Sequence, residues 1–237
     1  MRAIKAETIA LLAVAALAGA GPAIGASAPS AGATLSAALG NAARHGSFRT
    51  TESSRSVGRE YVSAADVAAQ EGQQRVTVSP GWQARFLVVS GVAYIAGNQS
   101  GLTQYFGFPA AAARKAGSRW VSIPSSNPGY ASASRDVLSA SVLAYVTPSG
   151  RLTETAPTNI DGKAAIGIRG TGPALRPNGA PSALTLYVST KGAPLPLRAV
   201  FDDKQGDRET LTLSAWNEHV ALQAPRDAIP IATLAHG

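Results

Sequence analysis

Apolar and polar residues alternate over much of the chain, most clearly between residues 184 and 201. Leu184, Leu186 and Val188 occupy every second position, and after a Lys-Gly-Ala-Pro sequence the alternation resumes toward Phe201. A period of two is typical of a strand with one buried face, and a Gly/Pro turn between two such runs indicates a hairpin. The pattern thus predicts a hairpin whose apolar face covers a closed core, a partner surface or a cavity.

Similar strand signals recur on both sides of this hairpin. The segments that we predict to contain strands are 47–78, 82–98, 151–170, 184–201, 209–216 and 219–225, the last ending near Pro225. Short turns are expected at Ser90-Gly91 and at Asp161-Gly162. Because the connections are short and hairpin-like, the sheet should be mostly antiparallel.

Helical spacing of apolar residues appears in three places. The segment 34–43 predicts a short amphipathic helix with Thr34 as its cap, 101–115 fits a broken helical segment, and 130–146 predicts one helix. The stretch 172–181 is expected to be a loop inside the sheet. With no linker long enough to divide the chain, we expect one helix, about six strands, a helical insertion and about six more strands in a single domain, 34–237.

The N-terminal residues have the pattern of an export signal. Arg2 and Lys5 precede an apolar run over 9–20, and small residues follow. We expect a signal peptide over 1–26 with cleavage somewhere in 25–33. The apolar run is shorter than the roughly 20 residues that a membrane-spanning helix needs, so the mature form should carry no transmembrane helix.

Composition narrows the classes of function. Of the 237 residues, 45% are hydrophobic and 15% charged, and the formal net charge is +7. The basic residues are scattered rather than clustered with aromatics, which argues against nucleic-acid binding. Weak attraction to an anionic envelope surface is one alternative, and a soluble basic protein without such a partner is the other. The sequence has no cysteine, which excludes disulfides, thiolate chemistry and lipid attachment through a cysteine.

Catalytic and metal-binding motifs are missing from the sequence. His45, His219 and His236 are isolated, and no Gly-x-Ser-x-Gly sequence occurs. Four carboxylates gather in 202–209, where a solvated turn is a simpler interpretation than a cation site. A catalytic pair of carboxylates is compatible with the sequence, but nothing points to a particular pair. We therefore predict a protein that is not an enzyme and has neither cofactor nor metal.

Several short phrases in a fixed order resemble one protein family. They include VSGVAYIAGN (89–98), AGSRWVSIP (116–124), NIDGKAAIGIRGT (159–171), LYVSTKGAPLPLRAVF (186–201) and TLTLSAWNEHVALQAP (210–225). In this order they resemble the actinobacterial LppX/LprG/LprA/LprF family, which has a LolA-like fold, and they span roughly 35–229. Members of that family typically keep a lipobox cysteine for anchoring, and this sequence has none.

The resemblance implies an α+β fold: a strongly curved, half-open antiparallel sheet, an unclosed barrel, with helices covering its concave face. It also implies that acyl chains of a lipid or lipoprotein lie between sheet and helices, with 101–115 and 130–146 as a lid, and it brings no catalytic residues. Without the cysteine, we expect a secreted, unanchored, monomeric carrier in the cell envelope. A sensor or interaction module of the same fold, or an envelope hydrolase, are the alternatives.

Alternation and this resemblance together suggest which side chains face the cavity. The residues expected to line it are Val76, Val78, Phe86, Val88, Tyr94, Leu138, Val142, Ile166, Ile168, Leu184, Leu186, Val188, Leu197, Phe201, Leu211 and Leu213.

Overall fold

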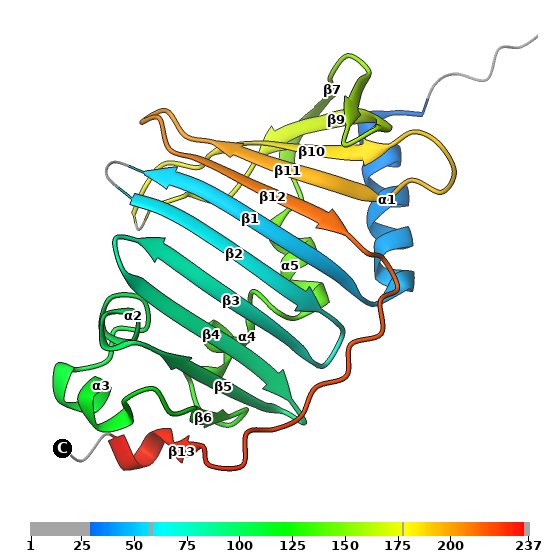
Figure 1. Cartoon of the computed structure of the whole chain (residues 1–237). Coiled ribbons are helices and arrows are strands. Elements are labelled where there is room, and N and C mark those ends of the chain that lie inside the picture. The colour runs from blue at the N-terminus through cyan, green and yellow to red at the C-terminus, as the bar shows by residue number, and fades with distance from the viewer. Residues whose placement is uncertain (1–28, 57–58, 177, 235–237) are drawn as a thin grey trace, which may run out of the picture.

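A computed structural model describes residues 29–56, 59–176 and 178–234 (Figure 1). The predicted signal peptide lies outside these described residues. Among the described residues, no helix is long and apolar enough to cross a membrane.

Within the described residues, one large open sheet of thirteen strands forms most of the fold. Its strands are β1 (Phe48–Ser56), β2 (Arg59–Val67), β3 (Gly72–Ser79), β4 (Trp82–Val89), β5 (Val92–Gly97), β6 (Val121–Pro124), β7 (Ser149–Glu154), β8 (Thr158–Ile160), β9 (Lys163–Thr171), β10 (Ala183–Ser189), β11 (Pro196–Asp202), β12 (Arg208–Ser214) and β13 (Ile229–Pro230). The order across the sheet is β13-β6-β5-β4-β3-β2-β1-β12-β11-β10-β9-β7, with β8 paired to β9. The pairing of β1 with β12 joins the two halves of the chain into one surface (Figure 1).

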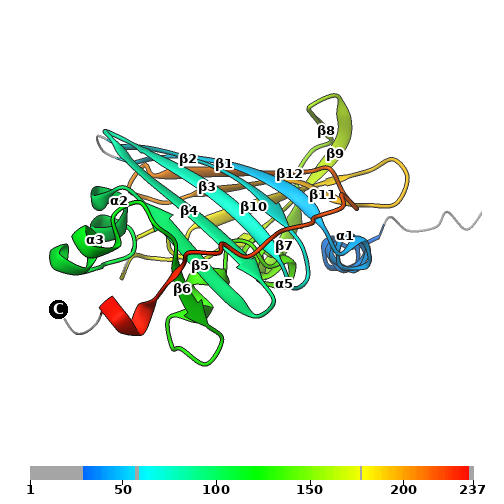
Figure 2. The ribbon, with the colours of Figure 1, turned by 60° about the horizontal axis from the view of Figure 1, so that its bottom comes forward.

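Short helices cover one face of this curved sheet, here called the inner face (Figure 2). They are α1 (Ala31–His45), α2 (Gln99–Gln104), α3 (Ala110–Ala116), α4 (Tyr130–Ser134) and α5 (Ser139–Tyr145), followed near the end of the chain by the 3-10 helix η1 (Ile231–Leu234). The fold is therefore α+β, an unclosed sheet with helices on its concave side, as the sequence predicts.

The predicted turns at the hairpin tips are confirmed. Ser90 and Gly91 have φ values of 52° and 73°, and Asp161 and Gly162 have 49° and 81°. Two successive residues in the left-handed region match the right-handed twist of the flanking strands, which is why Gly, Ser and Asp occur there.

The first helix begins earlier than predicted. Ser30, not Thr34, caps α1, and its hydroxyl accepts a hydrogen bond from the Ala33 N–H at 3.3 Å. Thr34 lies inside the helix, and its hydroxyl donates to the Glu154 carboxylate at 3.2 Å. The predicted start was wrong because Ser30, four residues upstream of Thr34, can equally accept a hydrogen bond from a free N–H at the start of the helix.

The single helix predicted over 130–146 is two short helices, so that prediction was wrong. Leu138 between them is extended, with φ −102° and ψ 128°, and forms a bridge to Ala68 beside the end of β2. The Ser139 N–H donates to the Ala68 carbonyl at 2.9 Å. A Cβ at Gly72 would stand 2.1 Å from the Val137 carbonyl oxygen, so a glycine is needed for this close approach. The contact of Leu138 and Ser139 with the sheet thus interrupts the helix that the spacing of apolar residues predicts.

The strand predicted over 219–225 is absent; these described residues form an extended segment outside the sheet. The chain runs from β12 back along the sheet and joins it only at β13, beside β6 (Figure 1). Ile229 pairs with Val121 in parallel, so the sheet is mixed rather than purely antiparallel.

Two apolar clusters fill the inner face. One packs α1 and α5 against β1, β2 and β9 to β12, and includes Phe48, Leu186 and Phe201, each fully buried. The other packs α2, α3 and α4 against β3 to β6, and includes Phe86 and Ile95. The candidate site lies at the second cluster, whose Phe86 and Ile95 line it.

Candidate ligand-binding site

A groove of about 410 Å³ opens on the inner face between the sheet and α2 to α4. Its lining residues are Phe86, Ile95, Tyr105, Phe106, Phe108, Ile123, Gly129, Ser132, Ala133, Arg135, Asp136 and Ile231. A volume in this range is typical of small-molecule sites, which are mostly apolar with a few polar groups. We call this feature the aromatic groove.

Three aromatic side chains that lie between α2 and α3 give the groove its wall. The rings of Tyr105 and Phe106 meet edge to face at 5.3 Å, and Phe106 lies 4.8 Å from Phe86 on β4. Tyr105, Phe106 and Phe108 are only partly buried. These rings therefore leave apolar surface in contact with water. Covering that surface with a ligand is favourable by about 25 cal/mol of free energy per Å².

Asn98 fixes the start of the segment that carries this wall. Its side-chain oxygen accepts hydrogen bonds from the Gly101 N–H at 2.8 Å and the Gln83 N–H at 3.2 Å. Its amide donates to the Gly81 carbonyl at 2.8 Å. A Cβ at Gly101 would stand 2.2 Å from the Gln83 carbonyl oxygen. The backbone of α2 therefore lies so close to the start of β4 that only a glycine fits at this position. The wall is thus held on the sheet.

Deeper on the inner face lies a small polar hollow of about 30 Å³. It is lined by Thr50, Glu52, Gln74, Arg135, Asp136, Val142, Tyr145 and Leu211. Arg135 and Asp136 also line the aromatic groove, so the two spaces adjoin. We call the smaller space the polar hollow.

Hydrogen bonds connect the polar groups around the hollow. The Gln74 amide donates to the Ser63 hydroxyl at 3.2 Å, and Ser63 donates to the Glu52 carboxylate at 3.2 Å. The Tyr145 hydroxyl contacts both oxygens of the Glu209 carboxylate at 2.9 and 3.0 Å. No group of His, Asp and Glu in the described part of the chain is arranged to hold a metal ion.

Burial changes the proton affinity of both glutamates. Desolvation, followed by the nearby Glu209, raises the pKa of Glu52 well above its ordinary value. Burial also raises the pKa of Glu209 from 4.5 to about 7, although the hydrogen bond from Tyr145 opposes the rise. Both groups take up protons far more readily than surface carboxylates.

Sequence reasoning missed this polar cluster. Glu52 alternates in phase with the buried Phe48 and Thr50 on β1, which was the available signal. The sequence does not predict that β1 pairs with β12. This pairing places Leu211 opposite Glu52, and Glu209 is therefore diagonally across from Glu52. Residues in such diagonal positions are about 7–8 Å apart on the same face.

Most of the residues expected to line a cavity lie on the inner face. Val76, Val78, Phe86 and Val88 belong to the cluster under α2 to α4, and Leu138 packs against it. Val142, Ile168, Leu184, Leu186, Val188, Phe201, Leu211 and Leu213 belong to the cluster under α1 and α5, and Ile166 packs against it. Of these residues, Phe86 lines the aromatic groove, whereas Val142 and Leu211 line the polar hollow. The remainder are packed in the core.

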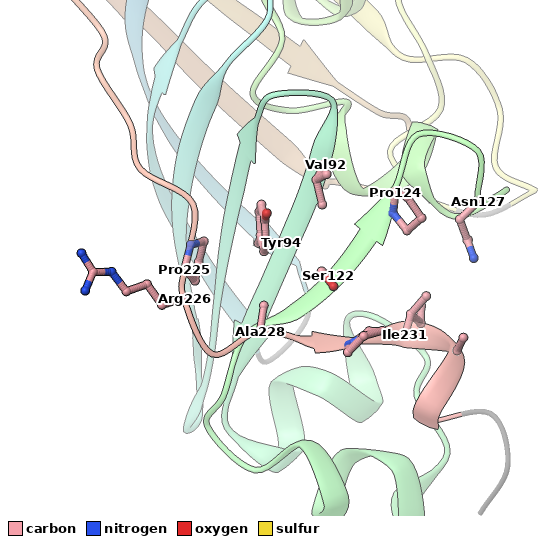
Figure 3. A pocket seen from close by; sticks show the side chains of 11 residues that line it. Val92, Tyr94, Ser122, Pro124, Asn127, Pro225, Arg226, Ala228 and Ile231 are labelled. Atoms are coloured by element: carbon pink, nitrogen blue, oxygen red, sulfur yellow. The ribbon is translucent and has the colours of Figure 1, made fainter.

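Tyr94 and Leu197 lie on the opposite face. Tyr94 alternates with the inward Ile95 and lines a different hollow of about 440 Å³ beneath the C-terminal segment (Figure 3). Leu197 packs with Ile160 and Tyr187. A register shift between Tyr187 and Val188 inserts an extra residue into β11, which turns Leu197 away from the inner face.

No protein-family model and no curated protein matches this chain. Among solved structures, LprF from Mycobacterium bovis is similar, with a TM-score of 0.55 and 22% identity over 82% of this chain and 96% of that one. The Mycobacterium tuberculosis lipoprotein LppX is similar, with a TM-score of 0.51 and 20% identity over 81% of this chain and 99% of that one. The chain shares their fold. The resemblance seen in the sequence is confirmed at that level.

Proposed function

We propose that this protein is a non-enzymatic carrier that holds the hydrocarbon chain of an amphiphile in the aromatic groove and moves it within the cell envelope. The main support for this proposal is the partly buried wall formed by Tyr105, Phe106 and Phe108. It is apolar surface that a bound ligand would shield from water. Each buried methylene contributes about 0.8 kcal/mol, so a chain of about ten carbons is held by several kcal/mol after the costs of association.

Three further features belong to this proposal. The protein acts outside the cytoplasm after removal of its export signal, it carries no lipid anchor, and it works as a monomer. The connection 105–108 between α2 and α3, together with α4, forms the lid over the ligand, because residues of both line the groove. The shared fold with LprF and LppX supports a binding role.

Filling the groove should weaken binding without unfolding the protein. Ser132 is exposed and lines the groove, so Ser132→Trp places an indole in the ligand's space. We expect the affinity for a fluorescent naphthylamine dye to fall at least about tenfold, equivalent to about 1.4 kcal/mol. The measurement is a fluorescence titration of purified protein.

The neighbouring Ala131 provides the matched control. Ala131 is also exposed on α4 but does not line the groove, so Ala131→Trp should bind the dye like the wild type. Equal dye affinity in the Ser132→Trp variant and the wild type would contradict the assignment of the groove.

A further inference from the structure

The aromatic groove continues into a space with different chemistry. Arg135 and Asp136 line both the groove and the polar hollow. A hydrocarbon chain lying along the aromatic wall would therefore direct its polar end toward Glu52 and Gln74. An occupant of both spaces must be an amphiphile, and the lining of the hollow decides which head group it carries.

The hollow and its surroundings are rich in hydrogen-bond acceptors. Glu52 and Asp136 line it directly, and Glu209 lies beside it through its bond to Tyr145. The positive charge among the lining residues comes from Arg135, which is already paired with Asp136 at 3.1 Å. A cation placed beside these carboxyls favours their ionised forms, which only accept hydrogen bonds. The site thus lacks donors more than acceptors.

Gln74 points to the same conclusion independently. Its side chain is 3% exposed and lines the hollow, and its amide nitrogen donates to Ser63. Its carbonyl oxygen Oε1 has no hydrogen-bond partner. A buried acceptor without a partner costs free energy, and a donor that reaches it would recover that cost. A donor that enters the hollow would satisfy this oxygen.

The size of the hollow limits the donor. About 30 Å³ is enough for one small polar group of about the size of a water molecule. A primary ammonium group or a hydroxyl is such a group. An ammonium beside the buried carboxyls of Glu52 and Glu209 favours their ionised forms and pairs with them, whereas an anionic head group supplies no counter-charge and is disfavoured.

We propose that the polar hollow is the head-group subsite of the carrier, and that it selects amphiphiles ending in a small, uncharged or positively charged hydrogen-bond donor, an ammonium group above all, over anionic ones. This inference rests on the proposed function and names the ligand class for the same site. The ammonium donates to Gln74 Oε1 and to the Glu52 carboxylate, with the Glu209 carboxylate beside the hollow as a further counter-charge, while the chain covers the aromatic wall.

Three probes with the same chain test the selection. Dodecylamine, dodecanol and dodecanoate are titrated below their micelle concentrations at pH 8, with displacement of the naphthylamine dye as the readout. We expect the amine to bind more tightly than the alcohol, and at least about tenfold more tightly than the carboxylate. Dodecanoate binding as tightly as dodecylamine would overturn the head-group inference but leave the carrier proposal standing. If no probe displaces the dye, both fail.

Substitutions assign the preference to the hollow. The double variant Glu52→Gln/Glu209→Gln keeps the shape of both side chains and should bind dodecylamine no more tightly than dodecanol. Glu60→Gln, on an exposed carboxylate paired with Arg55, is the matched control and should change nothing. Gln74→Met removes the unpartnered oxygen without a change of charge and should weaken amine and alcohol several-fold. An amine preference that survives the double variant, or Gln74→Met binding like the wild type, would overturn the inference.

Discussion

Replacing Phe201 with alanine is expected to lower the free energy of unfolding by about 3–5 kcal/mol while leaving the dye affinity of the aromatic groove within about twofold of the wild-type value. Phe201 is fully buried, and its ring lies 4.9 Å from that of Tyr145. Its removal leaves a void in the cluster under α1 and α5, which the surrounding side chains fill only in part. Urea denaturation of both proteins measures the difference.

Phe108→Ala is the matched comparison, because Phe108 lines the groove and is only partly buried. We expect a smaller loss of stability, about 1–2 kcal/mol, and a clear loss of dye affinity. The opposite pattern, in which Phe201→Ala is nearly as stable as the wild type but no longer binds the dye, would mean that the cavity lies under α1 and α5 and not under α2 to α4.

Stability should fall as the pH rises from about 4.5 to 7. The pKa of Glu209 is about 7 in the folded protein and 4.5 ordinarily, and that of Glu52 is raised in the same direction. The folded state therefore binds more protons than the unfolded state in this window, so the contribution is full below 4.5 and lost above about 7. For Glu209 it is on the order of 3 kcal/mol. Urea midpoints at a series of pH values measure it.

The variant Glu52→Gln/Glu209→Gln serves as the control for this pH dependence, since amides do not titrate. Its stability should be nearly flat between pH 4.5 and 7, and above pH 7 it should exceed that of the wild type. A wild type that becomes more stable over the same window would show that the two carboxylates are not buried as described.

The sheet could be predicted from the sequence because strand alternation is a local signal. Leu184, Leu186 and Val188 face inward as their spacing indicates, and the turns at Ser90 and Asp161 follow from residues that tolerate positive φ. Local spacing is misleading where distant contacts decide. Leu138 leaves the helical conformation because it bridges to Ala68.

The candidate site was only partly predictable for the same reason. Of the residues expected to line a cavity, Phe86 lies in the wall of the groove, whereas most of the others pack in closed core, because alternation gives the face of a strand and not the space above it. The polar hollow depends on the β1–β12 pair, which places Leu211 opposite Glu52 and joins segments far apart in the sequence. No local pattern indicates that pairing.

Native mass spectrometry of the purified mature protein tests the central claim most directly. If the aromatic groove holds the chain of an amphiphile, gentle ionisation should show the protein together with an adduct of defined mass, and organic extraction should release a molecule of that mass. Ser132→Trp, prepared in parallel, should lack the adduct. Only the bare protein mass in the wild type, with no amphiphile in the extract, would contradict the carrier proposal.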